Sequence, residues 1–305
     1  MLGASIGLGC AALYGANQII VRRSVMRASV NYVANISIFS GPLFFALVAL
    51  LVGELSRMEQ FSWKAYLLFA SAGVVHFAMG RTFGYRSLQL IGATRTNLVT
   101  GLSAVVSVGL AVALLNERFT YLTAVGFTLS LIGPLLMGLK EGDTKGAKLS
   151  PDLYGRHVDR RTLWLGILFG LGAAVLWGSS AILIKLGLDS GGSPIAGALV
   201  SYVAASLAIS PSLLSGGNRR ELLTSSRGTL QLALMSGMTT NVSQFLRILA
   251  LDHTSVITVS LVTRTVPVWV LIMAFLVSRG QESFSKWVLM GNGLLLAGTV
   301  MVLLP

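Results

Sequence analysis

Two arginines lie deep inside apolar stretches of the chain, where a charge is costly. Arg264 lies about nine residues into its stretch, a depth of about 13 Å at a rise of 1.5 Å per residue. By the same measure, Arg81 lies about 10 Å from the opposite membrane face. In a hydrocarbon core of about 30 Å the two charges therefore lie at similar depths, and charges there mark a substrate path or an ion pair. We expect both arginines to face one substrate, with two separate salt bridges as the open alternative.

Uncharged polar and aromatic side chains accompany these arginines. Gln244 stands at the position of the second half of the chain that matches Arg81, and Arg247 follows it in the same stretch. The aromatic pair Tyr14 and Trp177 either lines a cavity or packs. The predicted substrate-binding set is Arg81, Arg264, Gln244, Asn97, Arg247, Asn17, Trp177 and Tyr14.

Two residues that perturb helices are assigned to gating. Pro267 follows Arg264 closely, removes a backbone hydrogen bond and frees a carbonyl group near Thr263. A kinked helix beside a buried arginine suits a gate or a binding site. Gly101 is the second predicted gating residue.

Acidic residues are scarce in the apolar stretches, so the polar set is mostly cationic. Proton relays in membranes are usually built from Asp and Glu chains, and none is evident here. His76 either binds a proton or is a hydrogen-bonded core histidine. Glu117 and Glu282 stand at equivalent turns, where we expect structural pairing and charge opposite helix N-termini rather than substrate contact. The pattern favours an anionic or zwitterionic substrate and exchange or facilitated transport, and disfavours proton antiport of cationic drugs.

The composition requires a membrane to hold these residues. Of 305 residues, 54% are hydrophobic and 11% are charged, whereas soluble domains have about 25% charged residues. The net charge of +12 is spread between apolar segments rather than gathered in one patch, so we expect no nucleic-acid partner. With one cysteine, Cys10, an intramolecular disulfide and a thiolate metal cluster are excluded. No ATP-binding motif is found, and we expect no cofactor.

Ten segments reach the length of a membrane-spanning helix, which is about 20 mostly apolar residues. Five lie in each half, and an odd number inverts the second half relative to the first. The fold class is therefore an all-α membrane protein with ten transmembrane helices in two inverted five-helix repeats. Residues 1–140 form the first repeat, 141–161 a basic linker and 162–305 the second repeat. The predicted segments are 2–22, 32–53, 63–88, 92–115, 120–139, 162–188, 194–214, 228–251, 255–278 and 285–304.

The two halves are similar in sequence at an offset of about 163 to 165 residues. Tyr14-Gly15-Ala16-Asn17 recurs as Trp177-Gly178-Ser179-Ser180. The pairs Glu117 and Glu282, Phe119 and Phe284, Gly126 and Gly291, and Gly133 and Gly298 also match. Secondary transporters are commonly built from such repeats, with the substrate site where the repeats meet.

These motifs resemble the drug/metabolite transporter superfamily and its EamA-type members with ten helices. The resemblance rests on Leu176-Trp177-Gly178-Ser179-Ser180, on Tyr85-Arg86-Ser87-Leu88 with Gly92-Ala93-Thr94-Arg95, and on Asn116-Glu117-Arg118-Phe119 with Gln281-Glu282-Ser283-Phe284. It covers nearly the whole chain and implies a metabolite transporter. The chain departs from the family pattern in having Tyr14 instead of tryptophan in the first repeat and Ala104 where the second repeat has Pro267.

The function expected is a secondary transporter that moves a small polar metabolite by alternating access. Its expected partners are that substrate and the lipid bilayer of the cell membrane, with the protein a monomer or a homodimer. An integral membrane enzyme acting on lipid-linked substrates and a non-transporting receptor or assembly protein are the alternatives. Basic residues number about 16 on the linker side and about four on the side of the termini, which places the termini outside, whereas the family resemblance suggests inside.

Overall fold

All regular elements of the described chain are helices. The computed structural model describes residues 2–25, 27–141, 159–277 and 286–303. The expected all-helical architecture is confirmed for these residues. The helices long and apolar enough to cross a membrane are Leu2–Val25, Val30–Val52, Arg95–Leu115, Arg160–Asp189, Pro194–Leu213 and Val256–Met273.

The first half begins and ends its helices at residues suited to those positions. Ser29 and Ser62 cap α2 and α3 by accepting backbone N–H bonds, and Gly53 and Asn116 end α2 and α5 in the left-handed conformation. The elements are α1 (Leu2–Val25), α2 (Val30–Val52), η1 (Ser56–Gln60), α3 (Trp63–Gly73), the π-helical η2 (Val74–Gly80), α4 (Arg81–Gly101), α5 (Ser103–Leu115) and α6 (Tyr121–Glu141).

The second half follows the same plan with more interruptions. Asp159 caps α7, and its hydrogen bonds from the side chain and backbone of Thr162 hold the pKa of the Asp159 carboxyl below its usual value. Ser226 and Ser255 cap α10 and α11. The elements are α7 (Arg160–Asp189), α8 (Pro194–Ile209), η3 (Ser210–Leu214), α9 (Gly216–Thr224), α10 (Arg227–His253), α11 (Val256–Val262), η4 (Thr263–Thr265), α12 (Val266–Val277) and α13 (Lys286–Leu303).

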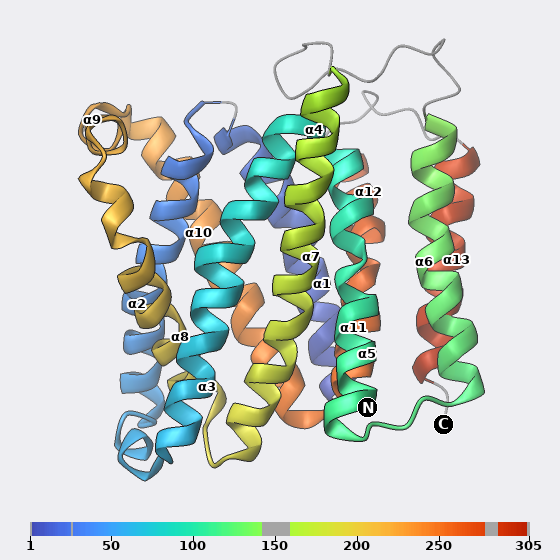
Figure 1. The fold of residues 1–305 in the computed structure, drawn as a ribbon, viewed down its shortest axis with the longest axis horizontal. Coiled ribbons are helices and arrows are strands. Elements are labelled where there is room, and N and C mark those ends of the chain that lie inside the picture. Colours follow the sequence, from blue (N-terminus) through green and yellow to red (C-terminus); the bar gives the residue numbers. More distant parts are fainter. Residues whose placement is uncertain (1, 26, 142–158, 278–285, 304–305) are drawn as a thin grey trace.

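Helix α4 reverses its direction along its length. Ser87 Oγ and Thr96 Oγ1 are 3.0 Å apart, whereas nine residues of straight helix would separate them by about 13.5 Å. A Cβ at Gly170 of α7 would meet Ser87 on one arm and Val99 on the other. The sequence predicts two segments separated between residues 88 and 92, and the structure instead turns an unbroken helical element at this place (Figure 1).

Helices of the two halves pack on one another rather than among themselves. Helix α1 lies against α10, α4 against α7, α2 against α8, and α6 against α13 (Figure 1). The pair α6 and α13 meets at glycines, since a Cβ at Gly133 would lie 2.4 Å from the Gly291 carbonyl oxygen and one at Gly298 would lie 2.4 Å from that of Gly126. Glycines on the facing surfaces let two membrane helices approach closely.

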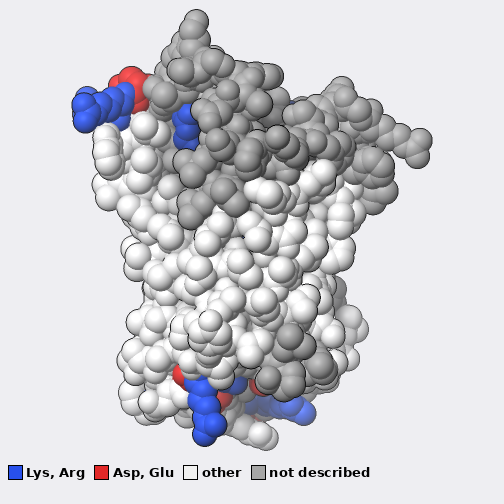
Figure 2. Space-filling view, turned by 90° about the vertical axis from the view of Figure 1, so that its right-hand side faces the viewer, with Lys and Arg blue, Asp and Glu red and all other residues white. Residues whose placement is uncertain are grey.

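The outer surface has an apolar band between two charged ends. Figure 2 shows Lys, Arg, Asp and Glu at the top and bottom of one face, with uncharged residues between them. Large apolar side chains such as Leu43, Leu51 and Val175 are exposed, and a lipid bilayer is the environment that such a belt requires. Both termini lie at one end of the molecule, and α9 lies at the other (Figure 1).

Candidate functional site

Arg81 is buried at the start of α4, directly after the π-helical turn η2. Its side chain is 4% exposed, and its Nη1 donates to Ser37 Oγ of α2 at 2.7 Å. The guanidinium carbon lies 5.2 Å from the ring centroid of Phe77, a cation–π distance. Arg81 is therefore held in place by its own neighbours. The π-helical turn was not predicted from the sequence, and such turns are frequent at functional sites.

His76, in the same π-helical turn, links three helices. Its Nε2 is 2.7 Å from Gln244 Nε2 of α10, and its Nδ1 is 2.7 Å from Ser180 Oγ of α7. Because the amide nitrogen of Gln244 donates, the ring Nε2 accepts and the ring proton is on Nδ1. Trp177 Nε1 donates to the His76 carbonyl oxygen at 3.2 Å. Of the two roles left open for His76, the structure has the hydrogen-bonded core histidine.

Arg247 interacts with several of the predicted site residues and has a side-chain N–H donor without a partner. Its Nη1 is buried and has no hydrogen-bond partner. The residue interacts electrostatically with Tyr14, His76 and Arg264. Arg81 also interacts with Tyr14 and His76, so the arginines of the two halves are joined through these shared neighbours.

Amide side chains on α1 and α10 carry buried acceptors without a hydrogen-bond partner. Asn17 Nδ2 donates to Thr240 Oγ1 at 2.8 Å, while Asn17 Oδ1 is buried without a partner. Gln244 Oε1 and Asn241 Oδ1 are also buried and unpartnered. Unsatisfied buried groups are costly, and a bound ligand or water is a usual reason for them.

Arg264 lies where the ninth predicted segment is interrupted. The chain passes from α11 through the 3-10 turn η4 to α12, with Pro267 in the first turn of α12. Arg264 Nη1 donates to the Gly101 carbonyl oxygen at 2.9 Å and Nη2 to Ser103 Oγ at 3.1 Å. Its Nε is buried without a partner. The break between α4 and α5 at Leu102 thus meets the break between α11 and α12, and both predicted gating residues lie at this crossing.

No carboxylate neutralises the buried arginines in the described residues. The ion pairs found there join Arg57 with Glu54, Lys185 with Asp189 and His253 with Asp252, all near the helix ends. A buried charge without a counter-ion is strongly unfavourable. The alternative of two separate salt bridges is therefore not found among the described residues.

Most of the predicted set gathers around this cluster, with one exception. Asn97 is exposed, and its amide contacts Gln18 Oε1 at 3.4 Å rather than the cluster. Ser37, Ser103 and Ser180 bind the cluster's polar groups and were missed. Serine is common in membrane helices, where it also bonds its own backbone, so its sequence position carried no distinguishing signal.

A small cavity lies beside Arg81 and Ser37. A cavity of about 150 Å³ lies between α2, α8 and η3, and it is lined by Ile38 and Thr82, the neighbours of Ser37 and Arg81. Ligand pockets usually have about 300–1,000 Å³. This cavity is therefore smaller than those that usually hold a ligand.

Glu117 has the structural role expected of it. Its carboxylate oxygens accept the backbone N–H groups of Val256 at 2.7 Å and Ile257 at 2.9 Å, at the N-terminus of α11. The prediction of charge opposite a helix N-terminus is confirmed for Glu117. Its counterpart Glu282 lies outside the described residues.

Similarity to known proteins extends over both halves of the chain. The model of the EamA-like transporter family matches residues 1–139 and 164–304. The chain belongs to the EamA-like transporter family. A solved structure titled "Crystal structure of protein" matches with a TM-score of 0.75 and 14% identity, over 99% of this chain and 96% of that chain, which supports the fold alone. No curated protein matches the chain in sequence.

Membership of the EamA-like transporter family assigns the class of the protein. It is a multi-pass integral membrane protein of the drug/metabolite transporter superfamily, built from two similar halves. The family is one of transporters, so a small-molecule substrate and a lipid environment follow. No group of three metal-ligating side chains is found in the part of the chain that the structure describes.

Proposed function

We propose that this EamA-like protein is a secondary transporter for a small anionic or zwitterionic metabolite, working by alternating access in the cell membrane. The observation that carries the proposal is the set of buried Arg81 and half-buried Arg247 and Arg264, which has no carboxylate partner among the described residues. In a low-dielectric interior an anion gains most from such fixed donors. A cationic drug would meet only repulsion.

The proposed architecture is ten transmembrane helices in two inverted repeats. Several contacts are related by the sequence offset between the halves, and α1 on α10 corresponds to α7 on α4. Gly126 and Gly133 meet Gly298 and Gly291 in the same relation. Arg264 bonds to Gly101, its own counterpart position 163 residues away. Contacts between equivalent positions are expected near a two-fold axis in the membrane plane.

The arginines of the cluster differ in whether their neighbours already satisfy them or leave an N–H group for the substrate. Arg81 is fixed by Ser37 and Phe77, whereas Arg247 and Arg264 each keep an N–H without a partner. We assign the substrate anion to Arg247 and Arg264, with Gln244, Asn17 and Tyr14 beside it and Trp177 fixing the His76 turn. Asn97 remains a predicted contact for another conformation.

Exchange is the mode of transport that the charges favour. An empty site would carry the charge of several arginines through the closed state, which raises the energy of the return step. A bound anion offsets part of that charge, so the loaded protein changes conformation more easily. The breaks at Leu102 and at Thr263–Thr265 supply the hinges for the movement.

Thermal unfolding of the purified protein tests the proposal. A panel of organic anions, phosphorylated metabolites, amino acids and cationic drugs is added to the wild type, Arg264→Ala, Arg247→Ala and Arg57→Ala. A true ligand at about 100 times its Kd adds about 2.7 kcal/mol to the free energy of unfolding. We expect an anion or zwitterion to stabilise the wild type and the exposed-arginine control, and to lose its effect in Arg264→Ala.

Stabilisation by cationic drugs, or an anion effect unchanged in Arg264→Ala and Arg247→Ala, would contradict the proposal. A ligand found in this way is then tested for uptake and for counterflow in proteoliposomes. Uptake that needs substrate on the opposite side identifies exchange.

A further inference from the structure

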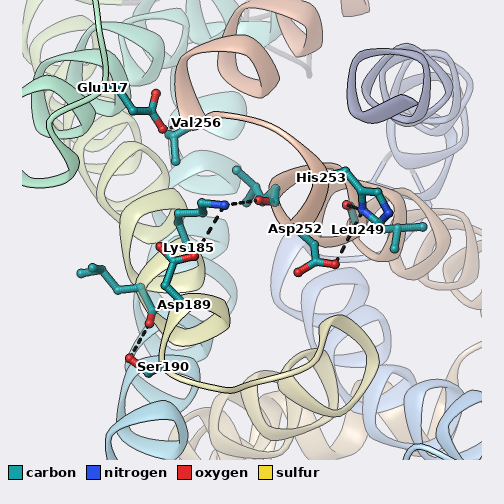
Figure 3. A network of polar contacts seen from close by, with 10 residues as sticks. Glu117, Lys185, Asp189, Ser190, Leu249, Asp252, His253 and Val256 are labelled. Atoms are coloured by element: carbon teal, nitrogen blue, oxygen red, sulfur yellow. Dashed lines mark hydrogen bonds and ion pairs between the residues drawn. The ribbon is translucent and has the colours of Figure 1, made fainter. Parts of the chain in front are cut away.

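Glu117, in the first half of the chain, binds the N-terminus of α11 in the second half, at the end of the molecule where the termini lie. Glu117 follows α5 and accepts two N–H groups of the first turn of α11, from Val256 and Ile257. Figure 3 shows this contact beside the Lys185–Asp189 ion pair within α7. Lys185 Nζ also donates to the Leu251 carbonyl oxygen of α10 at 3.1 Å, which joins α7 to α10.

The same two helices, α5 and α11, are joined a second time at the candidate site. Arg264, just beyond the end of α11, bonds to Gly101, the last residue of α4, and to Ser103, the first residue of α5. Helix α11 is therefore bound to α5 at both ends, by Arg264 near the middle of the membrane and by Glu117 at the surface. A substrate anion that takes the Arg264 guanidinium removes the inner bond and leaves Glu117 as the remaining one.

Helix α11 contacts part of the face of α1 that carries Cys10 and Tyr14. A Cβ at Gly7 would lie 3.3 Å from Val262 of α11, and one at Gly3 would lie 2.8 Å from Thr254, which precedes α11. Gly3, Gly7, Cys10 and Tyr14 are spaced by four and three residues and so share one face of α1. Cys10 is 0% exposed, and Tyr14 belongs to the cluster. Movement of α11 would uncover a path along this face.

We propose that Glu117 is a latch that holds α11 closed over the substrate path on the side of the termini, and that release of Arg264 by a bound anion allows it to open. The latch rests on the proposed transport function, because it controls access to that site. It assigns to Glu117 a conformational role beyond capping a helix.

Two other carboxylates make similar contacts and serve as matched controls. Glu54 accepts from Ser193 Oγ at 2.6 Å near α8, and Glu221 accepts from the backbone N–H of Ser29 at 2.7 Å at α2. The hydrogen bonds of these two carboxylates lie at opposite ends of the bundle and are present together in this structure. Neither hydrogen bond involves α11 or Arg264. We therefore expect both to persist when α11 moves.

The single cysteine reports opening directly. Cys10 is 0% exposed and its Sγ donates to the Ser243 carbonyl oxygen of α10 at 3.2 Å, and it lies one turn after Gly7, which packs on Val262 of α11. The rate at which an anionic thiosulfonate reagent modifies Cys10 in nanodiscs is measured for the wild type, Glu117→Gln, Glu54→Gln and Glu221→Gln. The amide of Glu117→Gln places an NH₂ group against one of the two N–H donors. We expect modification about tenfold faster than in the wild type, equivalent to about 1.4 kcal/mol, and near-wild-type rates for the controls.

A second variant breaks the latch from the other side. Val256→Pro removes one of the two N–H groups that Glu117 accepts, at the first position of α11, where proline fits a helix. Ser255 before it is already extended, with φ −67° and ψ 154°, as a residue preceding proline requires. We expect the same acceleration. Monodisperse elution and cooperative unfolding select the variants that are compared.

Wild-type rates in both Glu117→Gln and Val256→Pro overturn the latch, as does equal acceleration in all three glutamine variants. The assay contains no substrate, so its result is separate from the transport proposal. Failure of every anion to stabilise the protein overturns the anion site, whereas unchanged Cys10 reactivity overturns only the latch.

Discussion

At the scale of single residues, the buried arginines differ in how they are satisfied. Arg81 has a 2.7 Å hydrogen bond and an aromatic ring, while Arg247 has a buried Nη1 with no partner. A partnered charge contributes to the fold, whereas an unpartnered one costs stability and is retained for function. We therefore expect Arg81 to contribute to stability and Arg247 to contribute to function.

Arg247→Met is expected to leave a more stable protein than Arg81→Met, by about 1–3 kcal/mol in the free energy of unfolding. Arg247→Met removes an unsatisfied donor, and Arg81→Met leaves Ser37 without its partner. Denaturant unfolding of the two variants in the same detergent gives the difference. Equal stability, or the reverse order, would show that Arg247 has a structural counter-charge.

The pair His76 and Gln244 should behave as one unit. Their 2.7 Å contact is buried, and Ser180 holds the other ring nitrogen. A double-mutant cycle of His76→Leu and Gln244→Leu is expected to give a coupling free energy of about 0.5–3 kcal/mol. A coupling near zero in thermal or chemical unfolding would place the pair outside the network.

At the scale of elements, interruptions of helices mark the places that can move. The π-helical turn carries His76, the 3-10 turn carries Arg264, and α4 reverses direction at its middle. Close glycine contacts join α6 to α13, where no room is left for a side chain. His76, Arg81 and Arg264 thus lie at interruptions, whereas Arg247 and Gln244 lie in the regular helix α10.

Gly298→Ala and Gly293→Ala in α13 form a matched pair that tests the glycine contact. A Cβ at Gly298 would lie 2.4 Å from the Gly126 carbonyl oxygen, whereas nothing lies within 4 Å at Gly293. We expect Gly298→Ala to lower stability by about 1–3 kcal/mol through overpacking. Gly293→Ala should be neutral or raise stability by up to about 1 kcal/mol through helix propensity. Similar unfolding of both variants would mean that α6 and α13 are not tightly packed.

At the scale of the whole molecule, an even number of membrane-spanning helices returns the chain to the side of the membrane where it begins. The structure has both termini at one end and α9 at the other (Figure 1). Basic residues number about 16 on the linker side and about four on the side of the termini, an asymmetry that marks the cytoplasmic side in membrane proteins.

Reporter fusions at the two ends are expected to agree with each other. By the charge asymmetry, alkaline phosphatase fused to the C-terminus should be active and a fluorescent protein fused there should be dark, because both termini would be outside. The opposite pattern would show that the orientation suggested by the family resemblance holds. Disagreement between N- and C-terminal fusions would contradict the number of spans.

The sequence by itself determined the class of the protein and the identity of most cluster residues. Apolar runs of membrane length require helices, because backbone polar groups in lipid must be bonded within the segment. A charge in such a run is conspicuous without any structure, which is why Arg81, Arg247 and Arg264 were found. The matching halves likewise predicted a family of transporters.

The tertiary structure decided which of these residues meet and which are satisfied. Ser37, Ser103 and Ser180 are partners of the cluster only because α2, α5 and α7 bring them within 3.1 Å of it. Glu117 reaches the N-terminus of α11 across 139 residues of chain. Hydrogen bonds between distant segments depend on helix packing and on local interruptions of helices, and neither is encoded in the periodicity of one segment. The partners, and with them the proposed latch, were therefore beyond the reach of the sequence.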